Sequence, residues 1–69
     1  MKFDVYGRFR LDIVRVDGGW VAYRLQDGSR TRDDSIAIPA TLRPDELVGY
    51  LDDLYHELGS PGRSIRALP

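Results

Sequence analysis

The stretch that decides the fold is FRLDIVRVDGGWVAYRLQ, residues 9–26. Apolar and polar side chains alternate in its first half, in phase with Phe3 and Val5 upstream. Because successive side chains of a strand point to opposite faces, this alternation predicts an antiparallel strand with one face on a core. Asp17-Gly18-Gly19 is typical of a tight turn, and Trp20–Gln26 has the aromatic and β-branched residues of a second strand.

The length of this turn decides which side chains of the two strands share a face. A three-residue loop, 17–19, keeps the apolar residues of the first strand in phase on the core and pairs Asp12 with Arg24 across the strands. A two-residue loop at 18–19 places Asp12 opposite Leu25 instead, so we predict the three-residue loop. In this register the face away from the core receives Val14, Val16, Trp20 and Ala22.

Further along the chain the pattern changes from strand to helix. Asp27-Gly28 predicts a second turn, residues 29–34 an exposed edge strand or a loop, and 35–38 a short third strand that Pro39 ends. Pro44 suits the first position of a helix that Gly59 and Pro61 end. Leucines recur at helical spacing and form its apolar stripe: Leu47, Leu51, Leu54 and Leu58.

The elements together predict the fold class. We expect one small α+β domain over residues 1–69, with an antiparallel sheet of three strands packed on one amphipathic helix, in the order ββ(β)α(β). A fourth, short edge strand in the tail, where Ile65 and Leu68 lie among arginines, is the alternative.

The composition limits the classes of protein that fit. A chain of 69 residues buries only about 60 % of its unfolded surface, so its stability is marginal unless a disulfide, a bound metal or oligomerisation adds to it. It has no cysteine, which excludes disulfides and thiolate metal sites. No run is apolar enough for a signal peptide or a membrane span, so a cytoplasmic location without membrane contact is expected. The net charge is −1, but residues 1–32 carry +3 and residues 33–69 carry −4.

No group of side chains predicts catalysis. Asp52 and His56 lie four residues apart, a spacing that suits a metal, but a metal site needs a further ligand, and a solvated helix face explains the pair. The serines lack a nucleophile motif, and the glycine-containing runs lack the Lys-Ser/Thr of a phosphate loop. We therefore expect no catalytic residue, metal, cofactor or small-molecule ligand, and hence a protein that is not an enzyme.

The candidate sites are surfaces instead. One helix covers only one face of the sheet, and a Trp beside valines on the other face forms an apolar patch typical of interfaces. The candidate interface is Val14, Val16, Trp20 and Ala22. It predicts a protein–protein interaction module that pairs with itself as a homodimer through the sheet face, or with another protein. The candidate basic face is Arg8, Arg10 and Arg24, which Arg30 and Arg32 could extend. Beside Tyr6 it suggests single-stranded RNA binding as an alternative.

Three segments carry a resemblance to known families: FDVYGRF at 3–9, GWVAYR at 19–24 and LDDLYHE at 51–57. They resemble a family of small, uncharacterised bacterial proteins of about this length, which implies no activity. DGGWVAY at 17–23 is also similar to the second strand of HicB-type antitoxin domains, and 41–47 is similar to the opening of their helix. That resemblance implies a small ribonuclease toxin as partner, although the segment that follows the strand differs.

Overall fold

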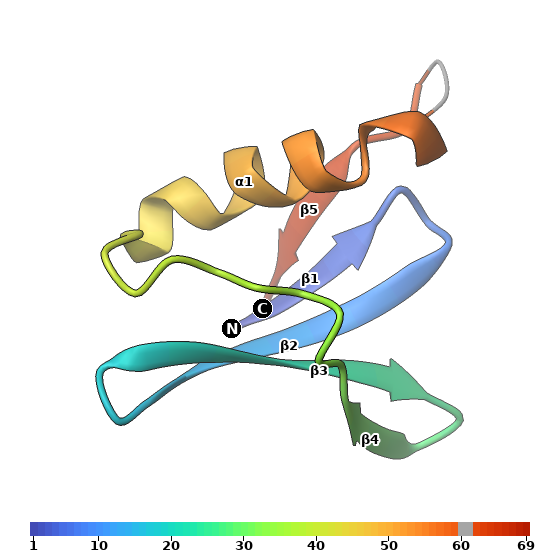
Figure 1. Cartoon of the computed structure of the whole chain (residues 1–69). Coiled ribbons are helices and arrows are strands. Elements are labelled where there is room, and N and C mark those ends of the chain that lie inside the picture. Colours follow the sequence, from blue (N-terminus) through green and yellow to red (C-terminus); the bar gives the residue numbers. More distant parts are fainter. Residues whose placement is uncertain (60–61) are drawn as a thin grey trace.

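Two layers form the structure, an antiparallel sheet and a helical layer on one of its faces (Figure 1). The computed structural model describes residues 1–59 and 62–69. The strands are β1 (Lys2–Val5), β2 (Phe9–Val16), β3 (Gly19–Gln26), β4 (Ser29–Arg32) and β5 (Ile65–Leu68). The helical layer consists of the 3₁₀ turn η1 (Pro44–Glu46), helix α1 (Leu47–Leu54) and the 3₁₀ turn η2 (His56–Leu58). The strand order is β4-β3-β2-β1-β5.

The α+β class is confirmed, but the predicted sheet was too small. Within the described residues it has five strands rather than three or four. Ser29–Arg32 forms the exposed edge strand β4, because the tight turn before it returns the chain directly along β3. The segment 35–38 is not a strand, since it belongs to a loop with Ile36 buried in the core. The tail pairs with β1 as β5. Pro61, a predicted helix stop, lies outside the described residues.

The turns between the strands share one backbone conformation. The angle φ is positive at both central residues of Tyr6-Gly7, Asp17-Gly18 and Asp27-Gly28. Asp17-Gly18 and Asp27-Gly28 are two-residue turns, which match the twist of the flanking strands, and Asp-Gly adopts them readily because Asp and Gly tolerate positive φ. The β1–β2 connection is one residue longer, because Val5 pairs with Phe9 and Arg8 follows Gly7 in the loop. The predicted three-residue loop between β2 and β3 is therefore wrong. The loop is Asp17-Gly18, and Gly19 already pairs with Val16.

This change in the turn rotates β3 relative to the prediction. Ile13 pairs with Ala22 and Arg15 with Trp20, so Trp20 and Ala22 lie on the helix-covered face. Asp12 lies opposite Tyr23 rather than Arg24. The face that the helix leaves uncovered carries the alternate residues of β3, which the predicted register had placed inside.

The core lies between the sheet and α1. Its largest fully buried side chains are Phe3, Val5, Leu11, Ile13, Leu47 and Leu51. The predicted leucine stripe is only half correct, since Leu54 and Leu58 are 45 % and 36 % exposed. Helix α1 ends at Leu54, and Tyr55 leaves helical geometry with φ −109° and ψ 21°, so the 3.6-residue spacing stops there. The Tyr55 ring packs edge-on against Phe9 instead, with the ring centres 5.2 Å apart.

The loop 33–43 crosses in front of the core on its way from β4 to the helical layer (Figure 1). Two side chains hold it. The Trp20 indole N–H donates to the Leu42 carbonyl over 2.9 Å, and the Tyr50 hydroxyl donates to the Ala37 carbonyl. The loop thus closes one side of the core, while the opposite face of the sheet has no covering element among the described residues.

Candidate functional site

The uncovered face of the sheet, called the open face below, follows from the strand register. Residues that lie opposite one another in paired strands share a face. The open face therefore carries Lys2, Asp4, Arg10, Asp12, Val14, Val16, Val21, Tyr23, Leu25, Arg30, Arg32, Arg66 and Leu68. Five of these residues are basic and two are acidic, so the open face has a net charge of +3.

Two carboxylates organise the basic side chains of the open face. Asp4 is only 8 % exposed, and its carboxylate accepts a hydrogen bond of 3.0 Å from the Gly7 N–H. Arg10 and Arg66 flank it, with N···O distances of 3.9 Å and 3.6 Å. Both arginine side chains remain about two-thirds exposed, so each guanidinium group lies near the Asp4 carboxylate while its donors face solvent.

Asp12 forms the second cluster, one row further along the sheet. Its carboxylate lies 3.3 Å from the amino group of Met1 and 3.2 Å from the Arg30 guanidinium. The same guanidinium stacks on the Tyr23 ring, 3.9 Å from the ring centre. Tyr23 is half-buried and lies opposite Asp12, in the row between the Arg10–Leu25 pair and the Val14–Val21 pair.

Apolar side chains fill the remaining corner of the open face, near the β2–β3 turn. Val14 pairs directly with Val21, and Val16 beside them is 45 % exposed. Leu25 lies on the other side of Tyr23 along β3. The open face thus combines an aliphatic corner, a central aromatic ring and a rim of arginines, a composition typical of binding surfaces.

The candidate interface of the sequence analysis is split between the two faces. Val14 and Val16 lie on the open face, as predicted. Trp20 and Ala22 do not, because the two-residue turn places them beneath the helical layer and the loop 33–43. The Trp20 ring is half-buried against the core, and the Arg15 guanidinium covers it at 4.2 Å from the ring centre.

The candidate basic face is split in the same way. Arg10 lies on the open face. Arg8 follows the β1–β2 turn and donates to the Leu58 carbonyl over 3.1 Å. Arg24 lies on the helix-covered face, 4.0 Å above the Phe9 ring and 3.5 Å from the Asp33 carboxylate. Sequence reasoning missed Tyr23 and Arg66 as open-face residues, whereas Arg30 and Arg32 were predicted to extend the basic face and lie on the open face. The signal that could have found Tyr23 was Asp17-Gly18 as the preferred two-residue turn.

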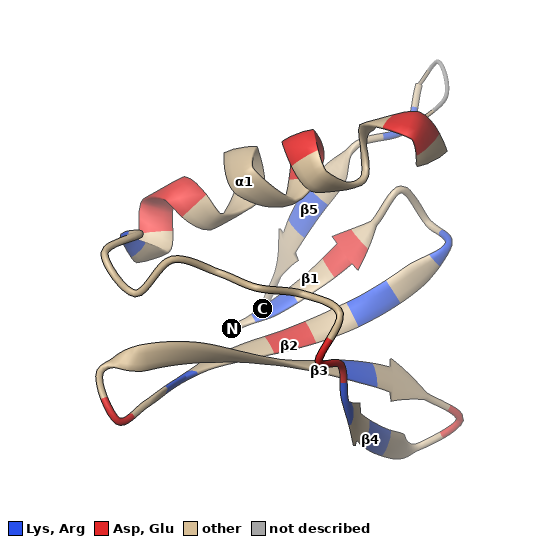
Figure 2. Cartoon of the chain, viewed as in Figure 1, with Lys and Arg blue, Asp and Glu red and all other residues tan. Residues whose placement is uncertain are grey.

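The two layers carry opposite charges (Figure 2). Residues 33–59, the loop and the helical layer, contain seven acidic residues and Arg43, a net charge of −6. Residues 1–32 and 62–69, which contain the sheet, have nine basic and four acidic residues, a net charge of +5. The uneven charge of the sequence therefore becomes a charge separation across the molecule.

Catalytic groups are not gathered in the described part of the chain. It contains no cluster of three His, Cys, Asp or Glu side chains that could hold a metal ion. The Asp52 carboxylate, half of the i, i+4 pair with His56, accepts a hydrogen bond from the Tyr6 hydroxyl. None of the described helices is long and apolar enough to cross a membrane.

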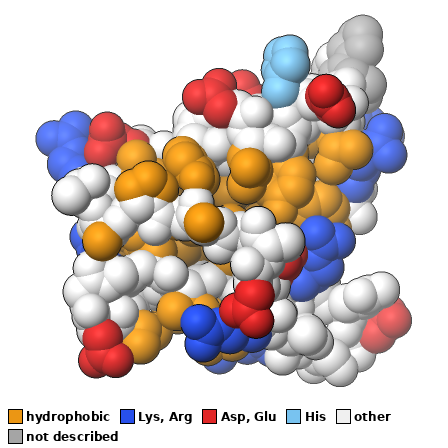
Figure 3. All heavy atoms as spheres, viewed as in Figure 1, with side chains coloured by type: hydrophobic (Ala, Val, Ile, Leu, Met, Phe, Trp, Pro, Cys, Tyr) orange, Lys and Arg blue, Asp and Glu red, His pale blue; other side chains and the backbone are white. Residues whose placement is uncertain are grey.

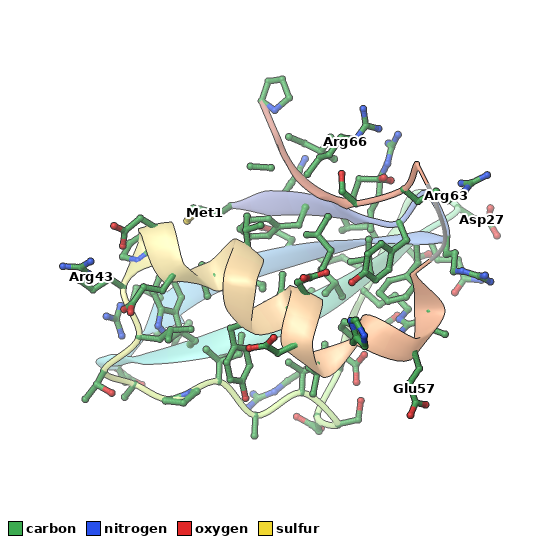
Figure 4. All side chains as sticks on the ribbon, turned by 90° about the horizontal axis from the view of Figure 1, so that it is seen from above. Met1, Asp27, Arg43, Glu57, Arg63 and Arg66 are labelled. Atoms are coloured by element: carbon green, nitrogen blue, oxygen red, sulfur yellow. The ribbon has the colours of Figure 1, made fainter. Side chains whose placement is uncertain are left out.

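Tyr6 connects three elements at one corner of the molecule. It is buried with a positive φ of 54°, a conformation that Tyr adopts rarely. Its N–H donates to the Ser64 carbonyl over 3.2 Å, and its hydroxyl donates to Asp52 on α1. Arg63, which like Arg66 projects from the β5 side of the molecule (Figure 4), donates to the Tyr6 carbonyl. These bonds hold the strained turn against the helix.

Tyr6→Phe tests this connection through pH. The hydrogen bond to Asp52, then burial and the negative charges of Asp52 and Asp53, raise the pKa of Tyr6 from about 10.0 to about 12. The folded state thus holds the phenol proton more tightly than the unfolded state, so this stability is complete below pH 10 and is lost between pH 10 and 12. Tyr6→Phe should be less stable than wild type at pH 8, and the difference should vanish towards pH 12.

The measurement is the urea midpoint of both proteins at pH 8, 10, 11 and 12. Tyr23→Phe is the matched control, because its hydroxyl forms no hydrogen bond with the described residues. A wild-type advantage over Tyr6→Phe that stays constant up to pH 12 would contradict the hydrogen bond to Asp52.

The fold and the open face define a class: a small α+β domain with a one-sided sheet and no assembled catalytic group among its described residues. Residues 1–68 match a domain of unknown function, DUF7661, and the chain belongs to this family. The expected membership of a small uncharacterised family is thereby confirmed. No curated protein and no solved structure matches the chain. The resemblance to HicB-type antitoxins therefore stays a prediction.

Proposed function

We propose that this protein is a non-catalytic protein-interaction module whose open face binds an acidic surface on a protein partner. The observation that carries the proposal is the composition of that face. Five basic residues against two acidic ones surround Tyr23 and the aliphatic corner, and no described element covers them. Interfaces of this kind combine aromatic and arginine anchors at the centre with a polar rim.

The orientation of the arginines supports recognition of carboxylates. Asp12 together with the Tyr23 ring orients Arg30, and the Asp4 carboxylate attracts Arg10 and Arg66. A guanidinium that is already oriented loses less conformational entropy when it forms a bidentate bond with a partner carboxylate. Like charges oppose the pairing of two open faces with each other, which favours an acidic partner surface over a two-fold dimer through this face.

A protein is a better partner than single-stranded RNA for this surface. RNA-binding sheets use exposed aromatic rings for base stacking. The Tyr23 ring is already stacked by Arg30, and the carboxylates of Asp4 and Asp12 lie among the arginines, where they repel phosphates. An acidic protein surface, including one on a small ribonuclease toxin, meets the same arginines without the need for base stacking.

The test is a binding measurement with matched variants. The tagged chain is purified from its native cells at low salt, co-purifying proteins are identified by mass spectrometry, and each is reconstituted as a purified protein. Calorimetry then compares wild type with Arg10→Gln/Arg30→Gln. Loss of two interfacial guanidinium groups should weaken binding by about 100-fold. Arg43→Gln, in the helical layer, should leave binding unchanged.

Two results would overturn the proposal. One is an affinity that the open-face variant leaves within about twofold of wild type. The other is tight binding of an oligouridine to wild type that the same variant abolishes, which would make the open face a nucleic-acid surface. Far-UV circular dichroism of each variant confirms that it is folded.

A further inference from the structure

An acidic and apolar surface lies at the end of the helical layer, on the side of the molecule away from the open face (Figure 1). Leu54 and Leu58 are among the most exposed large apolar residues of the described chain. Asp53 and Glu57 beside them are exposed and form no ion pair with any described residue. A shallow hollow of about 390 Å³ runs between these side chains and includes Tyr55 and His56.

This helix-end surface has a definite pattern. In the space-filling view, acidic side chains and the single histidine lie along the top of the helical layer, and hydrophobic side chains gather directly below them (Figure 3). Exposed leucines that lie close together are typical of surfaces that another molecule covers, and the carboxylates beside them are free to pair with basic groups of that molecule. A basic surface with its own apolar area is the complement that this pattern requires.

The open face of the same chain has that composition. It carries a net charge of +3, with the aliphatic corner around Val14, Val16 and Val21. The geometry points to a second copy of this chain as the acidic partner. The helix-end surface of one copy docks on the open face of the next, with Asp53 and Glu57 facing Arg10 and Arg30. This inference rests on the proposed use of the open face and names its occupant.

The arrangement has a consequence for assembly. The two docking surfaces differ and lie on opposite sides of the molecule, so the contact is head-to-tail. A head-to-tail contact produces rings or open chains of copies rather than a two-fold dimer. A standard interface of about 800 Å² per partner takes about a sixth of the 4757 Å² surface of the chain, so one copy has room for both contacts.

Sedimentation velocity of the full chain tests the assembly at protein concentrations from about 10 to 500 μM. At low salt, wild type should form species larger than a dimer whose proportion rises with concentration. At about 0.5 M NaCl it should be a monomer, because screening removes the attraction between the charged surfaces. A wild-type protein that stays monomeric at the highest concentration in low salt would overturn the inference without any variant.

A mixing experiment identifies the two surfaces. Asp53→Lys/Glu57→Lys damages only the helix-end surface, and Arg10→Gln/Arg30→Gln damages only the open face. The neutral glutamines offer no complementary charge to the introduced lysines. Each variant alone should be monomeric, but each keeps the surface that the other has lost. An equimolar mixture should therefore form 1:1 dimers and nothing larger. Larger species in either variant alone, or a mixture without dimers, would overturn the inference.

A charge-matched control separates the surface from overall charge. Glu57→Lys and Asp45→Lys make the same change within the helical layer but at its opposite ends, marked by Glu57 and by Arg43 next to Asp45 (Figure 4). Only Glu57→Lys should weaken self-association, by about 10-fold or more. An equal loss in both variants would overturn the inference. If wild type is monomeric but the open-face variant loses binding to a different acidic protein, only this inference is overturned. The proposed function then still holds.

Discussion

Leu51→Ala is expected to leave most of the chain unfolded at 37 °C. The Leu51 side chain is fully buried and belongs to the same core cluster as Phe3, Leu11 and Leu47. Truncation of such a leucine costs about 2–5 kcal/mol, because it removes apolar burial and leaves a cavity. The whole folding free energy of a chain of this length is only about 3–10 kcal/mol. Urea unfolding, followed by far-UV circular dichroism at 10 °C, where residual folded protein can be measured, gives the difference in the free energy of unfolding between wild type and the variant.

Leu54→Ala is the matched control for this substitution. It makes the same chemical change in the same helix, but Leu54 is 45 % exposed. Its cost should be about 0.5 kcal/mol or less, as is usual for surface positions. Equal losses in the two variants would mean that the leucine stripe is buried throughout, as its spacing in the sequence suggests, and that α1 does not end where the structure places it.

Trp20→Ala is the second large effect. The Trp20 ring packs against the core, and its indole N–H donates to the Leu42 carbonyl over 2.9 Å. Truncation of aromatic core residues costs about 3–5 kcal/mol, and for this half-buried ring we expect about 2–3 kcal/mol. The same urea titration measures it. If Trp20 were exposed on the open face, it would contribute to binding instead. Its truncation would then leave the free energy of unfolding almost unchanged.

Trp20→Phe distinguishes the two contributions of the indole. It keeps an aromatic ring, although a smaller one, against the core and removes the hydrogen bond that holds the loop 33–43 at Leu42. The expected loss is about 1 kcal/mol, the typical net contribution of one hydrogen bond. A Trp20→Ala variant as stable as wild type would place the indole in solvent and contradict the observed register.

The sequence predicts the α+β class because its two periodicities are clear. Alternation along β2 and the clustered turn residues indicate strands, and Pro44 before the leucines indicates the helix. The strand β5 is harder to predict, because Ile65 and Leu68 are short apolar signals among arginines and pair only once β1 is in place. The end of the helix at Leu54 also escapes prediction, since the leucine spacing continues to Leu58 although the backbone no longer follows it.

The open face could not be predicted because one residue of turn length decides it. Asp17, Gly18 and Gly19 all suit a turn, and the loop uses only the first two. The extra residue in the predicted loop inverted β3, so that Trp20 was assigned to the surface and Tyr23 to the core. The charge asymmetry was visible in the sequence. Its arrangement as a basic sheet and an acidic helical layer depends on the tertiary structure.

The central claim is that the Asp17-Gly18 turn sets a register in which Tyr23 and the arginines form the open face. Cross-strand backbone nuclear Overhauser effects in a uniformly labelled sample test it most directly. The structure predicts contacts of Val14 with Val21 and of Asp12 with Tyr23. Contacts of Val14 with Ala22 and of Asp12 with Arg24 would instead establish the three-residue loop, return Trp20 to the uncovered face and contradict the account.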